Sequence, residues 1–270
     1  MFADLQRIAD VLEKLPDGKL AIAFSGGVDS MTLARAAEMI LGKENVLLLF
    51  ADSVFAPSAE KNFALEWAKA RQLRCLQVPF EPLSDPLIAA NDLKKCYFCK
   101  KALFTTLLDY AAQAGFFTVA DGENLDDAAD YRPGRTAADE LHIRHIFVEA
   151  NLDKAAIRDL AHDLALSNAY APASACLASR IPCGNPITPE KLAAVDRAEN
   201  ILCKLGFAAS RVRHCGDLAK IEVAPQELEK LFSMREIILE KFKTLPFKSV
   251  ALDLAGYRRG AVNGTDQGKI

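Results

Sequence analysis

The chain has 270 residues, 33 lysines and arginines against 36 aspartates and glutamates, and a net charge of −3. Because 51% of the residues are apolar and the net charge is small, we exclude an intrinsically disordered chain and expect no nucleic-acid partner. No apolar run approaches the roughly 18–20 residues of a membrane-spanning helix, so we expect no membrane association. Seven cysteines without a signal peptide indicate a cytoplasmic protein.

Helical and buried-strand patterns alternate through the first part of the chain. The patterns predict helices at 3–15, 31–41, 59–71, 100–114 and 153–166, and strands at 19–24, 46–50, 75–78 and 116–120. Continuous apolar strands separated by helices indicate a parallel sheet with helices on both faces, because both faces of such strands are buried. We therefore expect an α/β domain over 1–170.

The pattern changes in the last hundred residues. It predicts helices at 189–205 and 225–242 and strands at 211–215, 219–223 and 249–254. This order favours a small C-terminal α+β domain with an antiparallel sheet over 171–270, serving substrate binding or oligomerisation.

A glycine loop, Ser25-Gly26-Gly27-Val28-Asp29-Ser30, joins the first strand to the next helix. Such a junction favours anions, because unpaired backbone N–H groups and the helix dipole point at one spot. The glycines let a phosphate approach the backbone, and Ser25 and Ser30 add hydroxyl donors. No lysine follows the glycines to reach a γ-phosphate. The simplest alternative is a Gly-Gly turn with Ser30 capping the helix.

Three cysteines form a candidate metal set. Cys96 and Cys99 open a predicted helix and face the same way, because they are three residues apart. This pair alone does not distinguish a redox pair, half a zinc site and iron–sulfur ligands, and the simplest alternative is two unrelated buried cysteines. With Cys176 it offers three thiolates, a set that can hold a [4Fe–4S] cluster with one open iron, whereas Cys183 as a fourth would close a structural zinc site. We expect Cys75 and Cys203 to be packing residues and assign Cys215 no role.

Polar residues follow the fourth predicted strand. Asp121, Gly122, Asp126 and Asp127 favour a site for Mg²⁺ or a ribose, the alternative being a solvated acidic loop. Ser179 and Arg180 lie beside the third cysteine, where a developing negative charge at an acyl carbon needs donors. The four histidines show no ligand spacing and are assigned no role.

Six segments in this order resemble the LarE family, the ATP-dependent sulfurtransferases of nickel-pincer-nucleotide biosynthesis within the PP-loop ATP pyrophosphatases. The segments are SGGVDS (25–30), KCYFCKKALF (95–104), DGENLDDAADYRPGRTAADE (121–140), ACLASRIPCG (175–184), RVRH (211–214) and LDLAGYRRG (252–260). The resemblance spans almost the whole chain and implies an adenine nucleotide alpha hydrolase-like fold. Family members adenylate the carboxylates of pyridinium-3,5-biscarboxylic acid mononucleotide, release pyrophosphate and form thiocarboxylates.

The resemblance also implies roles for particular residues and two bound cofactors, ATP and Mg²⁺. The loop holds pyrophosphate, Asp29 supports the loop or Mg²⁺, and Ser53 lies near the adenosine. Further implied positions are the nucleotide-binding residues Lys100, Asp121 and Gly122, the phosphate-binding residues Arg211 and Arg213, and Glu199 and Glu222, which match metal-binding positions of some relatives. A homo-oligomer and contacts with other proteins of the same biosynthesis are expected.

The family has two branches that differ in their sulfur source. One sacrifices a cysteine five residues before the position of Arg180, where this chain has Ala175. The other carries three cysteines, so the resemblance implies a [4Fe–4S] cluster on Cys96, Cys99 and Cys176, whose open iron presents sulfide to the acyl-adenylate. Cys183 stands where relatives are expected to have tyrosine, so a fourth ligand or a zinc site stays open.

Three other functions fit parts of the sequence. A PP-loop tRNA thiolase shares the sulfur chemistry, but the net negative charge and the lack of an obvious tRNA-binding module weigh against it. An ammonia-using adenylating synthetase shares the loop and needs no cysteine cluster. A regulatory nucleotide-binding protein needs the loop alone.

Overall fold

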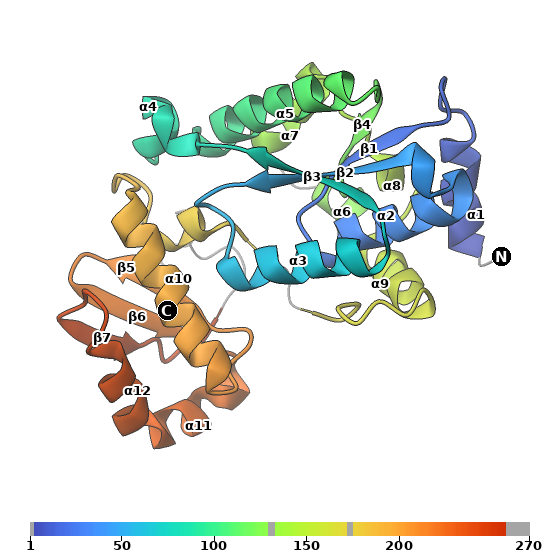
Figure 1. Ribbon diagram of the computed structural model, residues 1–270. Coiled ribbons are helices and arrows are strands. Elements are labelled where there is room, and N and C mark those ends of the chain that lie inside the picture. Colours follow the sequence, from blue (N-terminus) through green and yellow to red (C-terminus); the bar gives the residue numbers. More distant parts are fainter. Residues whose placement is uncertain (1–2, 129–132, 172–174, 258–270) are drawn as a thin grey trace. The chain divides into compact units, whose positions relative to one another are not determined.

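The computed structural model describes residues 3–128, 133–171 and 175–257 (Figure 1). The chain divides into two compact units: unit 1 is Met1–Pro82 with Cys96–Ser174, and unit 2 is Leu83–Lys95 with Ala175–Ile270. The chain thus passes between the units three times, and residues 83–95 belong with the C-terminal residues. The division into functional domains at 170 stays a prediction. The last three residues of the motif at 252–260 lie outside the described residues.

Unit 1 contains a four-stranded parallel sheet in the order β3-β2-β1-β4. Its strands are β1 (Leu20–Ala23), β2 (Val46–Asp52), β3 (Arg74–Pro79) and β4 (Val119–Ala120). The helices of unit 1 are α1 (Ala3–Leu12), α2 (Val28–Leu41), η1 (Lys43–Asn45), α3 (Ser58–Ala70), α5 (Lys95–Gln113), whose first residue belongs to unit 2, α6 (Leu125–Ala128), α7 (Pro133–Glu140), α8 (Ile146–Glu149) and α9 (Lys154–Asp163). The predicted α/β fold with helices on both faces is confirmed.

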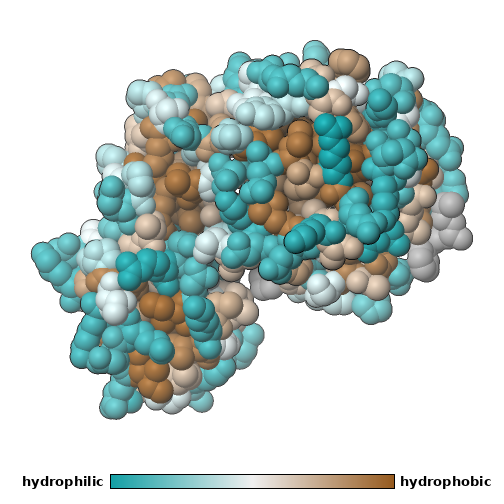
Figure 2. Space-filling model, viewed as in Figure 1, coloured by the Kyte–Doolittle hydropathy of each residue, from teal (hydrophilic) through white to brown (hydrophobic). Residues whose placement is uncertain are grey.

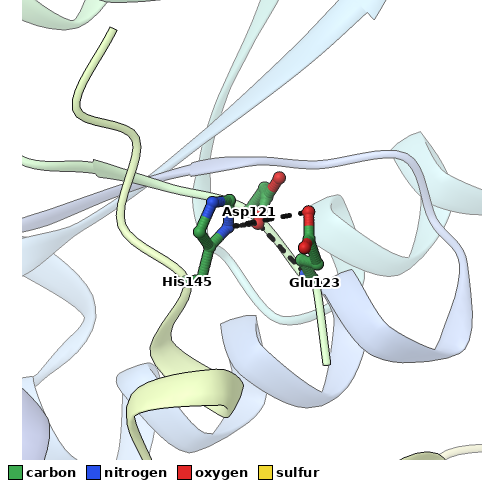
Figure 3. Close-up of side chains that lie close together, drawn as sticks. All are labelled: Asp121, Glu123 and His145. Atoms are coloured by element: carbon green, nitrogen blue, oxygen red, sulfur yellow. Dashed lines mark hydrogen bonds and ion pairs between the residues drawn. The ribbon is translucent and has the colours of Figure 1, made fainter. Parts of the chain in front are cut away.

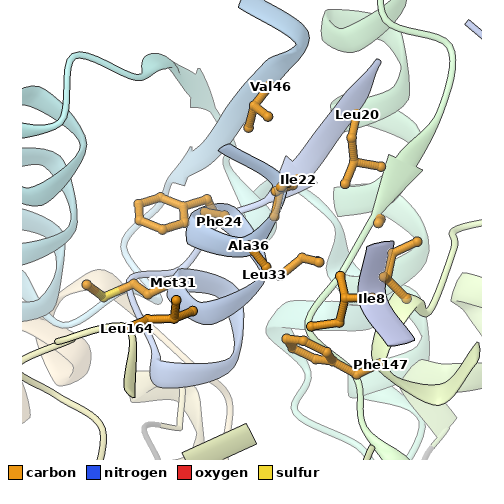
Figure 4. Packing of buried hydrophobic residues seen from close by; sticks show 14 of the residues in the cluster. Ile8, Leu20, Ile22, Phe24, Met31, Leu33, Ala36, Val46, Phe147 and Leu164 are labelled. Carbon is orange, nitrogen blue, oxygen red and sulfur yellow. The ribbon is translucent and has the colours of Figure 1, made fainter. Parts of the chain in front are cut away.

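Strand β2 shows why its sequence is a continuous apolar run. Leu48 and Phe50 point to the face covered by α1, α2, α3 and α9, whereas Leu47 and Leu49 point to the face covered by α5 and α7. Successive side chains of a strand alternate between faces, so a sheet buried on both sides requires apolar residues throughout. Figure 4 shows the core on the face covered by α1, α2, α3 and α9. Phe24 and Met31, which lie just before and just after the loop that joins β1 to α2, both belong to this core.

Unit 2 contains a three-stranded sheet in the order β5-β6-β7. Its elements are η2 (Pro82–Ser84), which begins on the last residue of unit 1, then α4 (Pro86–Ala89), η3 (Leu177–Arg180), α10 (Pro189–Lys204), β5 (Arg211–Cys215), β6 (Leu218–Glu222), η4 (Pro225–Glu227), α11 (Leu228–Ser233), α12 (Arg235–Phe242) and β7 (Ser249–Leu252). Its core packs Leu202 and Phe207 with Val212 and Ile221 of the sheet and Phe242 of α12.

Two predictions about unit 2 were wrong. β5 and β6 are antiparallel, but β7 runs parallel to β6, so the sheet is mixed. The predicted helix at 225–242 is three short helices. At Met234 the backbone N–H bonds to the carbonyl oxygen of Leu231, three residues back, and the Ser233 hydroxyl donates to the carbonyl oxygen of Lys230 (2.7 Å).

No helix in the described residues has the length and apolar character to cross a membrane. The visible face mixes polar and apolar residues (Figure 2), and both units carry exposed large apolar side chains, among them Phe117 in unit 1 and Leu93, Phe232 and Leu254 in unit 2.

Candidate functional site

The glycine loop in unit 1 is ordered by its two serines. The Ser30 hydroxyl donates to the carbonyl oxygen of Gly27 (3.1 Å) and accepts from the N–H of Ser25 (3.3 Å), while the Ser25 hydroxyl accepts from the N–H of Gly27 (3.3 Å). Gly27 precedes α2, and no described side chain caps that helix. Ser30 therefore closes the loop on itself, and the first turn of α2 keeps the donors that favour an anion.

Gly26 is required by space as well as by conformation. Its φ of +78° lies in the left-handed region, and a Cβ built on it would lie 2.5 Å from the Cβ of Ala64 in α3. Gly122 is also confined, because its Cβ would lie 2.9 Å from the Cβ of Asp29. The loop thus sits between α3 and the end of β4, with no room for side chains at either contact.

Lys154 supplies a positive charge at the loop. Its Nζ lies 2.5 Å from both carboxylate oxygens of Asp29. Burial raises the pKa of Asp29 above its ordinary value, and Lys154 counteracts only part of that effect. Lys154 could not be predicted from local sequence patterns, because it lies 125 residues from Asp29 and forms no local motif with the loop.

Lys154 is positioned by hydrogen bonds at the start of α9. Asp126 accepts the backbone N–H of Lys154 (3.1 Å), and Asp153 caps the helix through the N–H of Ala156 (2.8 Å). Asn124 in turn accepts the N–H of Asp126 (3.1 Å). The segment after β4 therefore connects the loop to α9.

A buried ionic cluster lies at the end of β4 (Figure 3). His145 Nδ1 lies 2.8 Å from Asp121, its Nε2 lies 3.3 Å from Asp139, and Glu123 lies 3.9 Å from Nδ1. Burial acts to raise the pKa of Asp121, but the His145 hydrogen bond and the charges of Lys100 and His145 outweigh it and hold the pKa below its ordinary value. Burial acts to lower the pKa of His145, yet the surrounding carboxylates raise it.

The cluster fits an imidazolium better than a metal ion. Single ligand atoms of Asp121, Glu123 and His145 lie within 4.8 Å of one another, as a metal site requires. Both ring nitrogens of His145 are engaged with carboxylates, however, and a nitrogen that donates a proton has no lone pair for a metal. Asp121 is only 8% exposed, so a solvated acidic loop does not describe this position.

Helix α7 links this cluster to the helix that carries two of the cysteines. Arg135 lies 3.3 Å from Glu123, and Glu140 accepts hydrogen bonds from Tyr97 and Lys101 at the start of α5. Gly134 faces the Lys100 side chain, since a Cβ there would lie 3.0 Å from the lysine Cγ.

The three candidate cysteine ligands lie in different units. Cys96 and Cys99, one helical turn apart in α5, are exposed and half-buried respectively and belong to unit 1. Cys176 is exposed in unit 2, where it precedes η3. The Cys183 thiol donates to the carbonyl oxygen of Asn91 (3.4 Å).

Arg180 holds the Cys176 turn from inside. It is 1% exposed, and its Nη1 donates to the carbonyl oxygens of Ala175 (2.7 Å) and Cys176 (3.2 Å) and to the Ser179 hydroxyl (3.0 Å). Its Nε and Nη2 donate to the two carboxylate oxygens of Glu199, both at 2.9 Å. The geometry of Arg180 is therefore that of a clamp on the turn.

A second buried ion pair lies beside it. Arg213 donates to Glu222 through Nε (3.0 Å) and Nη2 (2.8 Å) and to the carbonyl oxygen of Ser179 through Nη1 (2.9 Å). Arg211 lies 5.5 Å from the centroid of the Tyr257 ring. Glu199 and Glu222 thus both neutralise buried arginines, which explains why unit 2 buries these charges.

The remaining predicted residues are described by contacts outside the glycine loop and the Cys176 turn. Ser53 follows β2, where its hydroxyl accepts the N–H of Phe55. The Nζ of Lys100 lies 4.7 Å from the centroid of the Phe104 ring. Cys75 is half-buried, and burial raises its pKa to about 11, as suits a packing residue. The prediction that Cys203 is a packing residue was wrong, because it is exposed on α10.

Unit 1 brings together the glycine loop, Gly122 and Asp29 by direct contact, and unit 2 brings together Cys176, Ser179, Arg180 and Arg213. Sequence reasoning missed Lys154 and His145. It had no signal for them, since their partners lie on other elements.

The fold and the loop define the class of the protein: a PP-loop nucleotide-binding domain. The sequence model of the NAD synthase family matches residues 3–105, which include the loop.

Whole-chain relatives give the family. The pyridinium-3,5-bisthiocarboxylic acid mononucleotide synthase of Lactiplantibacillus plantarum is 34% identical over 247 residues, 92% of this chain and 90% of the relative. Uncharacterized proteins of Synechocystis sp. and Methanocaldococcus jannaschii are 37% and 30% identical, over 90% and 91% of this chain and 91% and 93% of their own lengths. The chain belongs to the LarE family, which confirms the resemblance seen in the sequence.

Proposed function

We propose that this protein is an ATP-using sulfurtransferase that converts pyridinium-3,5-biscarboxylic acid mononucleotide to its thiocarboxylate for a nickel cofactor. The observation that carries the proposal is the 34% identity to the Lactiplantibacillus plantarum synthase along 92% of the chain. A cytoplasmic homo-oligomer that contacts other proteins of the same biosynthesis is part of the proposal.

In the first step, the substrate carboxylate attacks the α-phosphate of ATP, and pyrophosphate leaves. The loop Ser25–Ser30 holds the pyrophosphate through its N–H groups and the N-terminal end of the α2 dipole. Lys154 adds the charge that the motif itself lacks, and Asp29 orients Lys154 or a Mg²⁺ ion. Activation is needed because a carboxylate oxygen is a poor leaving group.

In the second step, a sulfur nucleophile attacks the acyl carbon, AMP leaves, and a thiocarboxylate remains. Cys96, Cys99 and Cys176 are the proposed ligands of a [4Fe–4S] cluster, which supplies sulfide that stays nucleophilic at neutral pH. Two thiols one helical turn apart and a third that is exposed are a donor set that fits this cluster.

Residues of unit 2 orient the acceptor in this proposal. Arg180 and Glu199 hold the Cys176 turn, so Arg180 acts on the reaction through that turn. Arg211 and Arg213 are the proposed contacts for the mononucleotide phosphate, and Ser179, between Cys176 and Arg213, is the proposed donor to the acyl oxygen.

The matching NAD synthase model favours one second candidate, an ammonia-using adenylating synthetase, because it covers the nucleotide-binding part of the chain. The two functions differ in the nucleophile that attacks the acyl-adenylate, which is sulfide in one and ammonia in the other. With ATP and the dicarboxylate mononucleotide, the sulfurtransferase releases pyrophosphate and needs the three cysteines for product, whereas the synthetase yields an amide from ammonia without them.

The test is anaerobic purification followed by iron and zinc quantitation, with Cys96, Cys99, Cys176 and Cys183 each changed to alanine. Cys203→Ala is the matched control, because Cys203 is an exposed thiol of unit 2. We expect the first three variants to lose iron and sulfuration together, and Cys183→Ala and the control to keep both. If the protein instead binds zinc, and each of the four variants loses that zinc, the proposed sulfur chemistry is wrong, whereas the proposed ATP site is unaffected.

A further inference from the structure

Asn168 contacts the glycine loop and the helix that follows it, from a distant segment of unit 1. It lies after α9, 142 residues along the chain from Gly26. Its side-chain Nδ2 lies 3.2 Å from the carbonyl oxygen of Gly26 and 3.1 Å from the sulfur of Met31 in the first turn of α2. Because a carbonyl oxygen can only accept a hydrogen bond, the NH₂ end of the amide is the end that faces the loop.

The other end of this amide has no partner. The Oδ1 of Asn168 is buried and accepts no hydrogen bond from any described residue. A buried carbonyl group without a partner destabilises a fold, and an apolar side chain of similar size would avoid that loss. Fold stability therefore does not account for an asparagine here. The feature that an apolar side chain could not replace is the hydrogen bond to the loop.

The backbone at Asn168 is held by other groups. Leu166 and Ala169 are buried in the core that Figure 4 shows. The N–H of Ala171 donates to the carbonyl oxygen of Asn168 (3.0 Å), and Arg158 of α9 donates to the carbonyl oxygen of Ala171 (3.2 Å). A change of the Asn168 side chain therefore leaves this turn in place.

The loop group that Asn168 restrains is the peptide between Gly26 and Gly27. Because it is flanked by two glycines, it lacks the Cβ atoms that hinder rotation elsewhere in a chain. Its carbonyl oxygen accepts from Asn168, and its N–H donates to the Ser25 hydroxyl (3.3 Å). Without such restraints the loop spreads over several conformations, and its affinity for an anion falls with the fraction of molecules that hold the binding conformation.

We infer that Asn168 is a positioning residue that keeps the glycine loop in its anion-binding conformation by holding the carbonyl group of Gly26. This inference rests on the proposed function, in which the loop holds pyrophosphate. The effect of Asn168 on the ligand passes through the loop backbone. Loss of its amide donor therefore lowers the affinity for pyrophosphate by an amount that does not depend on the stability of the fold.

Isothermal titration calorimetry with inorganic pyrophosphate and Mg²⁺, together with thermal unfolding without ligand, tests this on the full chain. Asn168→Leu and Asn168→Ala both remove the amide donor, but leucine fills the space whereas alanine leaves a cavity. Asn45→Leu is the matched control. Asn45 is a half-buried asparagine of unit 1 that also donates to a backbone carbonyl oxygen (Leu41, 2.9 Å), but it precedes β2, at the opposite end of the sheet from the loop.

We expect both Asn168 variants to bind pyrophosphate about three- to tenfold more weakly, because one net hydrogen bond to the loop is lost. Their melting temperatures should differ, with Asn168→Leu equal to or above the wild type and Asn168→Ala below it. Asn45→Leu should lower the melting temperature and keep the wild-type affinity.

Two results overturn the inference. One is wild-type affinity in both Asn168 variants, and the other is an affinity that falls in step with the melting temperature across the three variants. The wild type separates this inference from the proposed function. If it binds neither pyrophosphate nor ATP, the proposed role of the loop fails and the inference fails with it. If the wild type binds both ligands and the Asn168 variants bind equally well, the inference fails alone.

Discussion

Gly26→Ala tests the close contact between the loop and α3. The added Cβ would lie 2.5 Å from the Cβ and 3.2 Å from the Cα of Ala64, a fully buried residue, and Gly26 has a φ of +78°. Gly18→Ala is the matched control. Gly18 has a φ of +63°, and a Cβ there meets nothing within 4 Å.

The two variants share one cost and differ in another. Placing alanine in the left-handed region costs about 1–2 kcal/mol at either position. Overpacking a buried contact costs about 1–3 kcal/mol more and applies only at Gly26. We therefore expect a loss of unfolding free energy of about 2–5 kcal/mol for Gly26→Ala and of about 1–2 kcal/mol for Gly18→Ala.

Urea-induced unfolding measures both losses, and a double variant isolates the clash. Ala64→Gly costs about 1 kcal/mol as a helix substitution but removes the Cβ that Gly26→Ala would meet. Gly26→Ala combined with Ala64→Gly should therefore recover about 1–3 kcal/mol relative to the sum of the single losses. Equal losses for Gly26→Ala and Gly18→Ala, or strict additivity in the double variant, would refute the contact.

Three further outcomes are expected. Lys154→Gln weakens ATP binding about tenfold, since a charged hydrogen bond is lost. In a profile of ATP affinity against pH, the loss of affinity on the acid side begins at higher pH in this variant, because the pKa of Asp29 rises further without Lys154. An acid side that does not move would count against the ion pair of Lys154 with Asp29. His145→Gln lowers the unfolding free energy in urea by about 3 kcal/mol near pH 6. The loss is smaller near pH 9, because a raised histidine pKa stabilises the fold fully below the ordinary value of 6.5 and less as pH rises through the folded value. Equal losses at the two pH values would contradict that sign. Arg180→Ala costs about 3–5 kcal/mol in the same assay, since the largely buried carboxylate of Glu199 loses its charged partner. Arg197→Ala, at an exposed arginine of the same helix as Glu199, changes stability by less than about 0.5 kcal/mol, and similar costs for the two variants would exclude the role of Arg180 in holding the turn.

Local sequence patterns predicted the framework that positions the loop. The strand before Ser25 is apolar on both faces because α2 and α5 cover opposite sides of the sheet. The helix after the loop was predicted at 31–41 from its apolar pattern, and the structure begins it three residues earlier, at Val28. These features depend on residues within one turn or one strand, so the sequence shows them directly.

The charged partners could not be predicted in the same way. Lys154 reaches Asp29 because α9 packs on α2, and His145 reaches Asp121 because residue 144 pairs beside β4. Such contacts depend on tertiary packing between segments far apart in sequence. The parallel direction of β7 was missed for the same reason, since the turn signals around 243–248 do not specify which edge of β6 the strand joins.

The threading of residues 83–95 into unit 2 limits how the protein can be divided. A C-terminal fragment that starts at Ala175 would contain the carbonyl groups of Ile181, Pro182 and Asn185 but not their amide donor, Asn91. Gene fusion or exchange of this part between relatives should therefore succeed only if the thirteen-residue insert is transplanted with it. Each unit is compact in space, but each is encoded by two separate stretches of the gene.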